Sequence, residues 1–355
     1  MKKNNATEKI LLEHFNRYPE LQIRDLLKFL YQSSFGCEHL ISSLNSVTDC
    51  IIKEAADLKE VNNHLIDKLD GDYSRVHLSY LKKGLSAVTL GKLFYLSSKT
   101  EPDGLKNLKE KLNITKNLIN DGLLPFSTDD FSKAVNEWSK NDYPAVHHSE
   151  KFRNKYNPSY RVIADRYVPF LPLFARIDKI CKKNHFVIAI DGRSTSGKSY
   201  LSKILNDLYD CNIIHMDDFF LRPEQRNKQR LNEVGGNIDR ERFLQEILIP
   251  LSQNRQINYR KYNCSSMKID SSVVLKPKRL TIIEGVYSMH KGFVRYYDLT
   301  VFLNISEDLQ KQRLIRRNSP EVVELFYKQW IPLEEIYFSE TGIKQRSDLI
   351  INIEE

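Results

Sequence analysis

Residues 192–199 read Gly192-Arg193-Ser194-Thr195-Ser196-Gly197-Lys198-Ser199 and fit the pattern G-x-x-x-x-G-K-[ST]. Directly before them, the apolar and largely β-branched run 186–190 predicts a buried strand. Directly after them, Tyr200 opens a helical pattern whose apolar positions share one face, namely Leu201, Ile204, Leu205 and Leu208. Strand, glycine-rich loop and helix in this order are the setting in which a phosphate-binding loop occurs.

The residue types in this loop suit the phosphates of a nucleotide. Two glycines let the backbone curl so that successive N–H groups point at phosphate oxygens, and the following helix directs the positive end of its dipole at the same point. Lys198 would place a mobile cation over the β- and γ-phosphates, and the Ser199 hydroxyl would ligate Mg²⁺. An ordinary glycine-rich turn is the alternative, but the strand and helix in register favour a nucleotide site. We therefore expect residues 192–200 to bind ATP together with Mg²⁺.

The composition is that of a globular protein. The length of 355 residues exceeds that of one average domain, so two domains are expected. No apolar run approaches the ~20 residues that a membrane span needs, and the basic start of the chain leads into an amphipathic pattern rather than a secretory signal. The five cysteines are scattered without C-x-x-C spacing, which suits a reducing cytoplasm: Cys37, Cys50, Cys181, Cys211 and Cys264. We expect a cytoplasmic protein without a membrane partner.

The formal net charge is +8 and the isoelectric point is near 9.0, which is compatible with nucleic-acid binding. The lysines, however, are spread along the chain among acidic residues, and the sequence contains neither a compact basic stripe nor a nucleic-acid module. An ATP site itself needs local positive charge. We expect a small-molecule partner rather than a nucleic acid, and the sequence leaves the formation of an oligomer open.

The N-terminal half is predicted to be helical. Apolar residues recur at helical spacing over 10–30 and again over 78–93. Alternating apolar stretches are scarce, so no sheet is expected in this half. A last helix over 171–180 leads into the strand before the phosphate-binding loop. These patterns predict a mainly α-helical domain of unknown role over 1–180 and a second domain over 181–355.

The second half alternates short apolar strands with helices. Strands are expected at 186–190, 212–216, 280–283, 299–303 and 348–351. Helices are expected between them, at about 198–209, 239–252, 306–318 and 320–340. This alternation predicts an α/β fold of the P-loop NTPase kind, with a parallel sheet covered by helices on both faces. In such sheets, ligands bind at the carboxyl ends of the strands.

Carboxylates follow two of these strands. Asp217 and Asp218 come directly after the second strand and Glu284 directly after the third, so they emerge beside the phosphate-binding loop. A kinase has to take a proton from the incoming hydroxyl and to hold Mg²⁺ near the transferring phosphoryl group. We expect Asp217 to act as the base and to lie, with Glu284 and Ser199, near the metal. For Asp218, capping or a turn is the better interpretation.

Several motifs together resemble the uridine kinase family, which includes uridine–cytidine kinases and, more distantly, nicotinamide riboside kinase, type I pantothenate kinase and phosphoribulokinase. The resemblance covers roughly residues 184–355. It rests on these stretches, in the order found in the family: 188–205, His215-Met216-Asp217-Asp218-Phe219-Phe220, Gly236-Asn237-Ile238-Asp239, Ile283-Glu284-Gly285 and the arginine-rich 313–317. It implies a kinase in which Asp217 activates the substrate hydroxyl and Glu284 lies near magnesium.

The same resemblance implies that Asp239 grips the ribose hydroxyls of a nucleoside. Arg240 and Glu241 stand here where uridine kinases usually continue with His-Pro. The alternative is that Asp239 caps the helix that begins at Arg240.

Further candidates for the acceptor pocket follow from the family likeness. Family members place a substrate-covering hairpin near 258–264. There Tyr259 and Tyr262 would stack on a base and Arg260 would hold a polar edge, although an ordinary solvent-facing hairpin has the same spacing. Further acceptor-pocket candidates lie just beyond Glu284, namely Tyr287 and His290.

Arg313, Arg316 and Arg317 lie three and four residues apart and so share a face of their expected helix. In small-molecule kinases such a helix forms a lid whose guanidinium groups neutralise charge on the transferring phosphoryl group. A solvated basic helix end is the alternative. We expect Arg313 and Arg317 to act in catalysis beside Lys198 and Asp217.

The N-terminal half carries unusually polar and aromatic connections around residues 36–39 and 147–161. His39, His148 and Arg161 are candidates for a second pocket there. Hydrogen-bonded structural histidines are the alternative, and the sequence has no metal-binding spacing such as H-E-x-x-H.

The sequence therefore predicts a small-molecule kinase that transfers the γ-phosphoryl group of ATP to a hydroxyl, first of all the 5′-hydroxyl of a nucleoside such as uridine or cytidine. Arg240 motivates one alternative, a kinase for a non-nucleoside metabolite. A second alternative is a regulatory protein in which ATP occupancy alters how the helical domain binds a partner, although such a protein has less need of a base such as Asp217.

Overall fold

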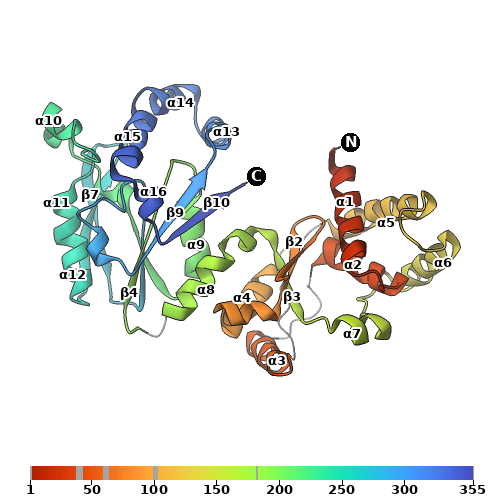
Figure 1. The fold of residues 1–355 in the computed structure, drawn as a ribbon. Coiled ribbons are helices and arrows are strands. Elements are labelled where there is room, and N and C mark those ends of the chain that lie inside the picture. Colours follow the sequence, from red (N-terminus) through yellow and green to blue (C-terminus); the bar gives the residue numbers. More distant parts are fainter. Residues whose placement is uncertain (1, 37–42, 59–63, 99–102, 181–182, 355) are drawn as a thin grey trace. The chain divides into compact units, whose positions relative to one another are not determined.

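The computed structural model describes residues 2–36, 43–58, 64–98, 103–180 and 183–354. The chain divides into two compact units, Met1–Lys179 and Ile180–Glu355, which are called unit 1 and unit 2 below (Figure 1). Within the described residues, no helix has both the length and the apolar character needed to cross a membrane.

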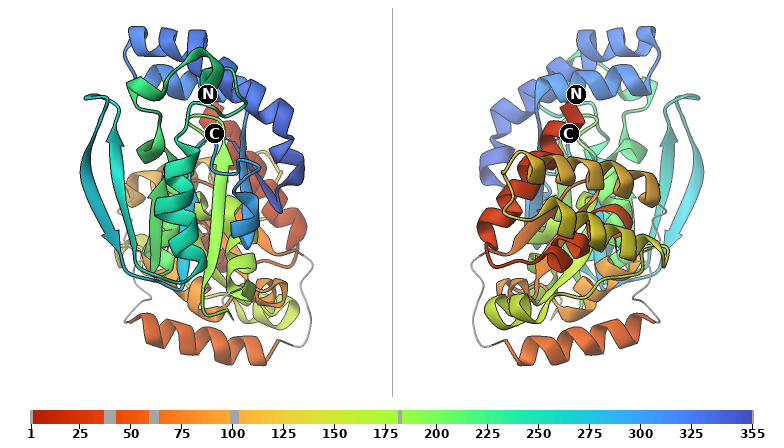
Figure 2. Two further views of the ribbon diagram at one scale, coloured as in Figure 1. Left: turned by 90° about the vertical axis from the view of Figure 1, so that its left-hand side faces the viewer. Right: turned by 90° about the vertical axis from the view of Figure 1, so that its right-hand side faces the viewer.

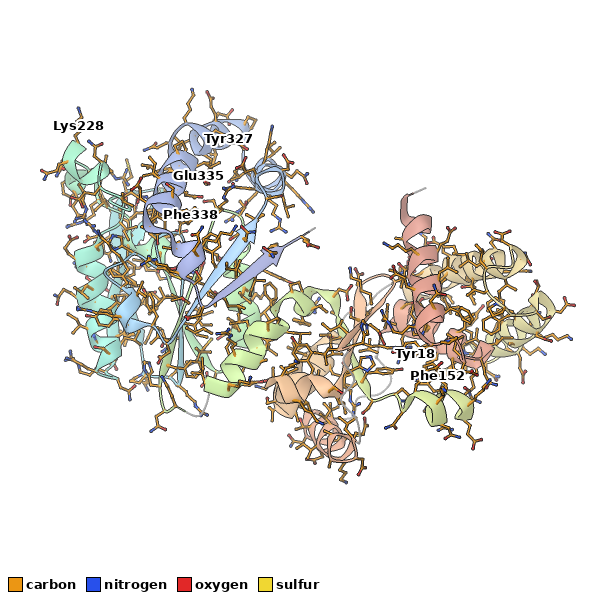
Figure 3. The ribbon with its side chains drawn as sticks, in the orientation of Figure 1. Tyr18, Phe152, Lys228, Tyr327, Glu335 and Phe338 are labelled. Atoms are coloured by element: carbon orange, nitrogen blue, oxygen red, sulfur yellow. The ribbon has the colours of Figure 1, made fainter. Side chains whose placement is uncertain are left out.

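Unit 1 is mainly helical. Its α-helices are α1 (Lys2–Arg17), α2 (Ile23–Phe35), α3 (Leu44–Ala56), α4 (Ala87–Ser97), α5 (Gly104–Asn120), α6 (Thr128–Ser139), α7 (Glu150–Tyr156) and α8 (Leu171–Ile180). Four of them start after a serine whose hydroxyl accepts an N–H of the first turn, namely Ser43, Ser86, Ser127 and Ser149. Aromatic rings pack together in the core: the ring centroids of Tyr18, directly after α1, and Phe152 of α7 lie 5.3 Å apart (Figure 3).

Unit 1 also contains a three-stranded antiparallel sheet, so the expectation of no sheet in this half is wrong. Its strands, in spatial order, are β1 (Ile66–Leu69), β2 (Tyr73–His77) and β3 (Tyr160–Ala164). All of β2 is buried, including its polar side chains. Arg75 Nε donates to Gln32 Oε1 at 2.9 Å, and His77 Nε2 lies 2.9 Å from Asp67 Oδ2. Because these polar side chains make hydrogen bonds inside the protein, the strand needs no apolar alternation and gave no strand pattern in the sequence.

The apolar pattern over 78–93 does not form one helix. A 3-10 helix covers Leu78–Lys83 and ends at Gly84, whose φ of +111° suits glycine. The α-helix α4 begins only after Ser86. The apolar pattern therefore spans two separate elements, the 3-10 helix and α4, which both pack apolar side chains inward.

Unit 2 holds a five-stranded parallel sheet with helices, which confirms the α/β fold class. The strand order is β10-β9-β4-β8-β5, and every neighbouring pair is parallel. The strands are β4 (Phe186–Gly192), β5 (Cys211–His215), β8 (Leu280–Glu284), β9 (Leu299–Ile305) and β10 (Leu349–Ile353). The central position of β4 places the phosphate-binding loop in the middle of the sheet's carboxyl edge.

Helices flank this sheet (Figure 1). They are α9 (Lys198–Leu208), α10 (Lys228–Leu231), α11 (Arg240–Phe243), α12 (Ile249–Ser252), α13 (Glu307–Arg317), α14 (Pro320–Leu325), α15 (Ile331–Thr341) and α16 (Ile343–Arg346). A separate hairpin of β6 (Ile257–Asn263) and β7 (Lys268–Leu275) stands at the edge of the unit, apart from the central strands (Figure 2).

Two helical stretches of unit 2 contain a π-helical turn just before a proline. Leu244–Leu248 precedes Pro250, and Phe326–Trp330 precedes Pro332. Proline lacks the N–H that an α-helix bonds to the carbonyl four residues earlier, and its ring crowds that carbonyl. The wider turn accommodates the ring, so that α15 continues α14 and returns toward the phosphate-binding loop.

The carboxyl ends of three adjacent strands bring polar residues together. Ile190 of β4 pairs with Glu284 of β8, and Glu284 in turn pairs with His215 of β5. The apolar residues earlier in these strands lie in the core. Because the strands are parallel, the loop after β4, the carboxylate of β8 and the imidazole of β5 share one edge.

Replacing Ile351 of β10 with alanine is expected to destabilise unit 2 by about 2–5 kcal/mol, because its side chain is 4% exposed and leaves a cavity when shortened. Its neighbour Ile350 is 40% exposed and points to the other face, so the same change there should cost about 0.5 kcal/mol. Urea denaturation followed by Trp330 fluorescence, in a Trp138→Phe background, measures both. An equal loss of unfolding free energy in Ile351→Ala and Ile350→Ala would contradict this packing.

Candidate active site

The phosphate-binding loop uses backbone conformations that suit glycine. Gly192 has φ +144° and Gly197 has φ +97°. A Cβ atom at position 192 would run into the carbonyl oxygen of Leu303, so only glycine fits there. Thr195 between them also has positive φ, +63°. The loop therefore curls between β4 and α9, as a loop must whose N–H groups converge on an anion.

Lys198 begins α9 and is 8% exposed. Its Nζ donates to the carbonyl oxygens of Gly192 (2.8 Å) and Arg193 (2.9 Å). Two buried polar atoms have no hydrogen-bond partner in the described part of the chain: Oγ of Ser196 in the loop, and Nε2 of Gln310, whose carbonyl oxygen accepts from Thr195 Oγ1 at 3.4 Å. Buried polar atoms normally have partners. The two unpaired atoms are therefore consistent with a loop that binds a polar ligand.

Glu284 is the centre of a polar cluster beside the loop. Ser199 Oγ donates to Glu284 Oε1 at 2.9 Å, and His215 Nδ1 lies 2.6 Å from the same oxygen. Burial opposes ionisation of Glu284, but the hydrogen bond and charge of His215, together with Lys198, outweigh it and hold the pKa of Glu284 below its ordinary value. The hydrogen bond to Glu284 in turn raises the pKa of His215. Glu284 is therefore a charged carboxylate at neutral pH.

Asp217 lies two residues beyond β5, in the 3-10 turn Met216–Phe219, and its side chain is exposed. The protein atoms crowded around its carboxyl desolvate it and raise its pKa; Lys198 lowers the pKa and Glu284 raises it. No hydrogen bond to another described residue occupies the carboxylate. It is therefore accessible to an incoming molecule and sits beside the charges of the phosphate-binding loop.

The adjacent Asp218 has a different role. Its Oδ2 accepts a hydrogen bond from the Tyr259 hydroxyl at 3.1 Å and lies 3.6 Å from Lys261 Nζ. Asp218 therefore anchors the β6–β7 hairpin to the turn after β5, which agrees with its interpretation as a structural residue.

Asp191 is a buried carboxyl directly before the loop, and no motif in the sequence marks it. Its oxygens accept hydrogen bonds from the N–H groups of Gly192 (2.7 Å) and Met289 (3.0 Å) and from the Tyr337 hydroxyl (3.0 Å). Burial raises the pKa of Asp191 to about 6, although these hydrogen bonds and Lys198 lower it. Asp191 thereby ties the base of the loop to α15 and to the segment after β8.

Helix α15 holds the loop through two further acidic residues. The Glu334 carboxylate accepts hydrogen bonds from the N–H (3.0 Å) and the hydroxyl of Ser194, and Arg193 Nη2 donates to Glu335 at 3.0 Å. Glu335 lies on α15 near Phe338 in Figure 3. Glu334 is 4% exposed, and burial raises its pKa. No spacing in the sequence marks Glu334, because carboxylates on helices are usually solvated.

Glu334→Gln is expected to tighten ADP binding about three- to tenfold at pH 8, because a negative charge beside Ser194 repels the incoming phosphates. Glutamine keeps the size and one acceptor oxygen. Since burial raises the pKa of Glu334, the native carboxyl takes up its proton at a higher pH than an ordinary glutamate, and the affinities of the two proteins should converge as the pH falls. Calorimetric titration measures this, with the more exposed Glu335→Gln as the matched control. Weaker binding by Glu334→Gln at pH 8 would contradict the expectation.

The arginines expected in a lid lie in different surroundings. Arg313 Nη1 donates to the carbonyl oxygen of Thr195 at 3.2 Å and so contacts the phosphate-binding loop. Arg316 and Arg317 are exposed in the last turn of α13. The structure therefore places Arg313, but neither of the other two, against the loop.

Asp239 has both carboxylate oxygens occupied within the protein. Oδ1 accepts from the N–H of Arg242 at 3.1 Å and Oδ2 from Gln225 Nε2 at 3.0 Å, and the residue is 3% exposed. It caps α11, which is the alternative to a sugar contact. Arg240, which stands where uridine kinases usually have His, lies with Nη1 3.4 Å from His290 Nε2.

The candidate residues of the hairpin also make internal contacts. Tyr259 is 2% exposed and stacks on Phe219, with ring centroids 5.5 Å apart. Tyr262 is buried, and its hydroxyl accepts from Arg226 Nη2 at 2.9 Å. Arg260 forms an exposed ion pair with a glutamate of the π-helical turn before α12. The two tyrosines are thus part of the core in this structure.

Tyr287 and His290 are buried as well. The ring of Tyr287 lies 4.8 Å from that of Tyr337. His290 Nδ1 accepts from the N–H of Gly292 at 3.2 Å, and burial together with Arg240 lowers the pKa of His290 to about 4. Both residues are therefore buried side chains of the segment that follows β8, and His290 is neutral at pH 7.

The residues present fit a magnesium ion. Ser199 Oγ and Glu284 Oε1, 2.9 Å apart, are oxygen donors of the kind that Mg²⁺ prefers, and Asp217 lies close enough to feel the charge of Glu284. No group of three or more His, Cys, Asp or Glu side chains able to hold a metal occurs among the residues that the structure describes. The protein would thus supply only part of the shell, with phosphate oxygens and water supplying the rest.

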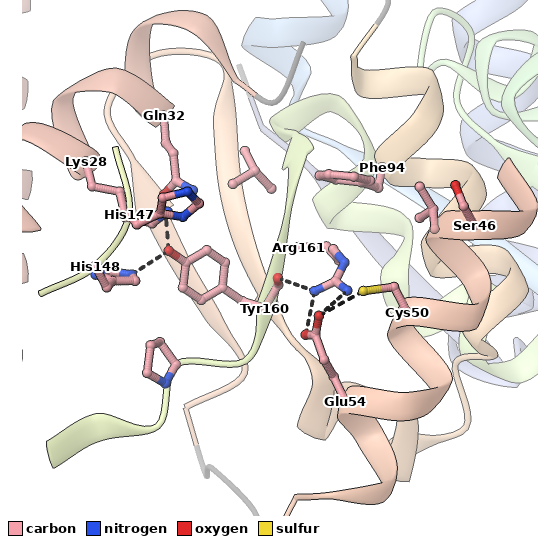
Figure 4. A pocket seen from close by; sticks show the side chains of 13 residues that line it. Lys28, Gln32, Ser46, Cys50, Glu54, Phe94, His147, His148, Tyr160 and Arg161 are labelled. Carbon is pink, nitrogen blue, oxygen red and sulfur yellow. Dashed lines mark hydrogen bonds and ion pairs between the residues drawn. The ribbon is translucent and has the colours of Figure 1, made fainter. Parts of the chain in front are cut away.

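The candidates for a second pocket lie in unit 1. His39 is outside the described residues. His148 and Arg161 both line one cavity there (Figure 4).

Comparison with known proteins agrees with the geometry of unit 2. Residues 187–321 match the model of the phosphoribulokinase / uridine kinase family, so the C-terminal unit carries a domain of this family. No protein with a curated description matches the chain. The match supports a small-molecule kinase, that is, a phosphotransferase that uses a nucleotide.

Solved structures with a similar fold include a possible uridine kinase from Bacillus stearothermophilus, with 21% identity and a TM-score of 0.38 over 50% of this chain and 98% of that chain. A shikimate kinase from Bacteroides thetaiotaomicron matches with 14% identity and a TM-score of 0.26 over 47% of this chain and 86% of that chain.

Proposed function

We propose that this chain is an ATP- and Mg²⁺-dependent kinase that transfers the γ-phosphoryl group of ATP to a hydroxyl of a small molecule, first of all the 5′-hydroxyl of a nucleoside such as uridine or cytidine. One observation carries the proposal: the phosphate-binding loop, the exposed carboxylate of Asp217 and the Ser199–Glu284 pair meet at the carboxyl ends of three adjacent strands. The family match of residues 187–321 supports it.

Each residue of the site has a separate role in the proposed reaction. The curled loop and Lys198 bind the β- and γ-phosphates, and Arg313 adds positive charge where it contacts the loop. Ser199 and Glu284 would hold Mg²⁺, which would supply positive charge to the phosphates. Asp217 accepts the proton of the attacking hydroxyl, and its raised pKa makes it a stronger base than an ordinary aspartate. Catalysis of this kind is positioning and electrostatic stabilisation.

A second acceptor class, a non-nucleoside metabolite with a hydroxyl, is favoured by one observation. Asp239, which would hold ribose hydroxyls in a nucleoside kinase, has both oxygens bonded within the protein, and Arg240 follows it. Arg240 itself forms an ion pair with Glu233, so the internal bonding of Asp239 carries this alternative.

The test is incubation of the full chain with ATP, Mg²⁺ and either uridine, cytidine or a mixture of hydroxyl metabolites, followed by mass spectrometry for the gain of one phosphate. A nucleoside monophosphate supports the first acceptor class, and a phosphorylated non-nucleoside supports the second. Tight ATP binding without any phosphorylated product would contradict a kinase and favour the regulatory alternative.

Arg313 donates to the carbonyl oxygen of Thr195 and so brings its charge to the phosphate-binding loop. Arg313→Met is expected to lower turnover about 10- to 100-fold, the size of one lost charge-assisted hydrogen bond of ~1.5–3 kcal/mol. The same change at Arg317, four residues along the same helix but exposed, should have a much smaller effect. Steady-state rates, or slow ATP hydrolysis in the absence of an acceptor, measure both. Equal losses would remove the distinction between the two arginines.

A further inference from the structure

Unit 1 contains a cavity of about 470 Å³, a size that suits a small metabolite (Figure 4). Its wall comes from helices α2, α3 and α4, strand β3 and the connection before α7. Figure 4 shows Lys28, Gln32 and His147 on one side of it and Phe94 on the other. The cavity therefore has a polar, positively charged side and an aromatic side.

Lys28 is the charged residue on the polar side of the cavity. Its Nζ donates to the carbonyl oxygen of Val146 at 3.0 Å, and it forms no ion pair within the described part of the chain. Burial, with the nearby charge of Arg75, lowers the pKa of Lys28 to about 8, so the ammonium form still predominates at neutral pH. An ammonium group has three donors. Lys28 can therefore give hydrogen bonds to a molecule in the cavity.

A second cation stands behind the wall. Arg75 is 1% exposed, its Nε donates to Gln32 Oε1, and its guanidinium lies 4.6 Å from the ring centroid of Tyr160. Gln32 and Tyr160 both line the cavity. The Nη2 atom of Arg75 is buried and has no hydrogen-bond partner among the described residues. A buried guanidinium that is only partly satisfied adds positive potential at this wall.

The carboxylates near the cavity are already engaged. Glu54 accepts two hydrogen bonds of 2.9 Å from Arg161. Asp25 accepts from Ser149 and lies 2.9 Å from His148 Nδ1, and these contacts hold the pKa of Asp25 low, at about 2, against the effect of burial. Burial lowers the pKa of His148 to about 4, so its ring is neutral at pH 7. Neither Lys28 nor Arg75 forms an ion pair with a carboxylate within the described part of the chain, although Lys28 feels the charge of Asp25 and Arg75 that of Asp67.

The opposite side combines apolar side chains with the polar Ser46, Cys50, Glu54 and Arg161 (Figure 4). Phe94, Val47 and Val162 line it and are buried. Apolar side chains at a cavity wall favour a ligand with an apolar or planar body, because its burial removes apolar surface from water.

We propose that this cavity is a binding site for a small organic anion, a carboxylate or phosphate ester whose charged head contacts Lys28 and whose apolar or planar body lies against Phe94. The site is a function of unit 1 and does not depend on phosphoryl transfer in unit 2. The wall of this site includes His148 and Arg161, the two described candidates for a second pocket.

The test is equilibrium dialysis of the full chain at pH 7 against a defined mixture, with mass spectrometry of what is retained. The anions are benzoate, phenylpyruvate, citrate, glycerol 3-phosphate and glucose 6-phosphate, and the neutral counterparts are benzamide and glucose. We expect the wild-type protein to retain at least one anion, and Lys28→Met to retain it at least tenfold less. Whether a carboxylate or a phosphate is retained identifies the head group.

Three variants distinguish binding in this cavity from misfolding, from a general effect of charge and from binding at the phosphate-binding loop. Lys28→Arg keeps the charge and should keep binding, which distinguishes loss of charge from loss of folding. Lys109→Met removes an exposed lysine of α5 and should have no effect. Lys198→Ala should still retain the anion if the phosphate-binding loop is not its site. Retention of no anion by the wild-type protein, equal retention by Lys28→Met, or equal retention of neutral counterparts would overturn the proposal.

Discussion

Asp217→Asn is expected to lower turnover by about 10²–10⁴-fold, the contribution of a positioned general base, while the affinity for ATP changes little. Asparagine has the same shape, and the side chain is exposed, so the fold should not change. The amide cannot take up the proton of the acceptor hydroxyl. Rapid-quench or steady-state phosphorylation assays measure the loss, and calorimetry measures the affinity.

The pH profile gives this prediction a second readout. Activity should rise with pH as Asp217 loses its proton, and because its pKa is raised, this limb should lie above that of an ordinary aspartate. The limb should vanish in Asp217→Asn. Asp218→Asn is the matched control, since that carboxylate is held by Tyr259 and Lys261. Turnover of Asp217→Asn at the native rate would exclude this carboxylate from the mechanism.

Lys198→Ala is expected to weaken the binding of ATP in the transition state by about 2–5 kcal/mol, a factor of about 30 to 5,000 in kcat/KM. The ammonium is nearly buried within the loop and would be the cation closest to the β- and γ-phosphates. Removing it leaves the phosphate charge without its partner at that place.

Lys203→Ala is the control on the same helix, because Lys203 is an exposed residue of α9. It should leave both kcat/KM and the calorimetric affinity for ATP near the native values. Native kcat/KM in Lys198→Ala would contradict a phosphate-binding role of the loop, and an equal loss in both variants would indicate a general effect of charge.

The parts of unit 2 that could be predicted from the sequence are those that local patterns determine. Buried parallel strands need continuous apolar runs, so β4, β5, β8, β9 and β10 were all visible. The loop requires glycine at 192 and 197 because of its backbone angles, and this requirement gave the motif. Because the carboxyl ends of parallel strands share one edge of the sheet, the sequence also predicted that Glu284 lies beside the loop.

The rest depends on long-range contacts that no local pattern records. Strand β2 is buried with Arg75 and His77 in it, and their partners Gln32 and Asp67 lie 43 and 10 residues away. Glu334 meets Ser194 across 140 residues of sequence. Similarly, the pattern of the hairpin could not show that Tyr259 faces the core.

The contacts of α15 with the phosphate-binding loop bear on how this protein can be dissected. The family match ends at residue 321, yet Glu334, Glu335 and Tyr337 brace the loop from beyond that point. A fragment trimmed to the matched region would keep every residue of the nucleotide motif and lose the scaffold that shapes it. Any truncation meant to retain nucleotide affinity has to run through Tyr337 at least.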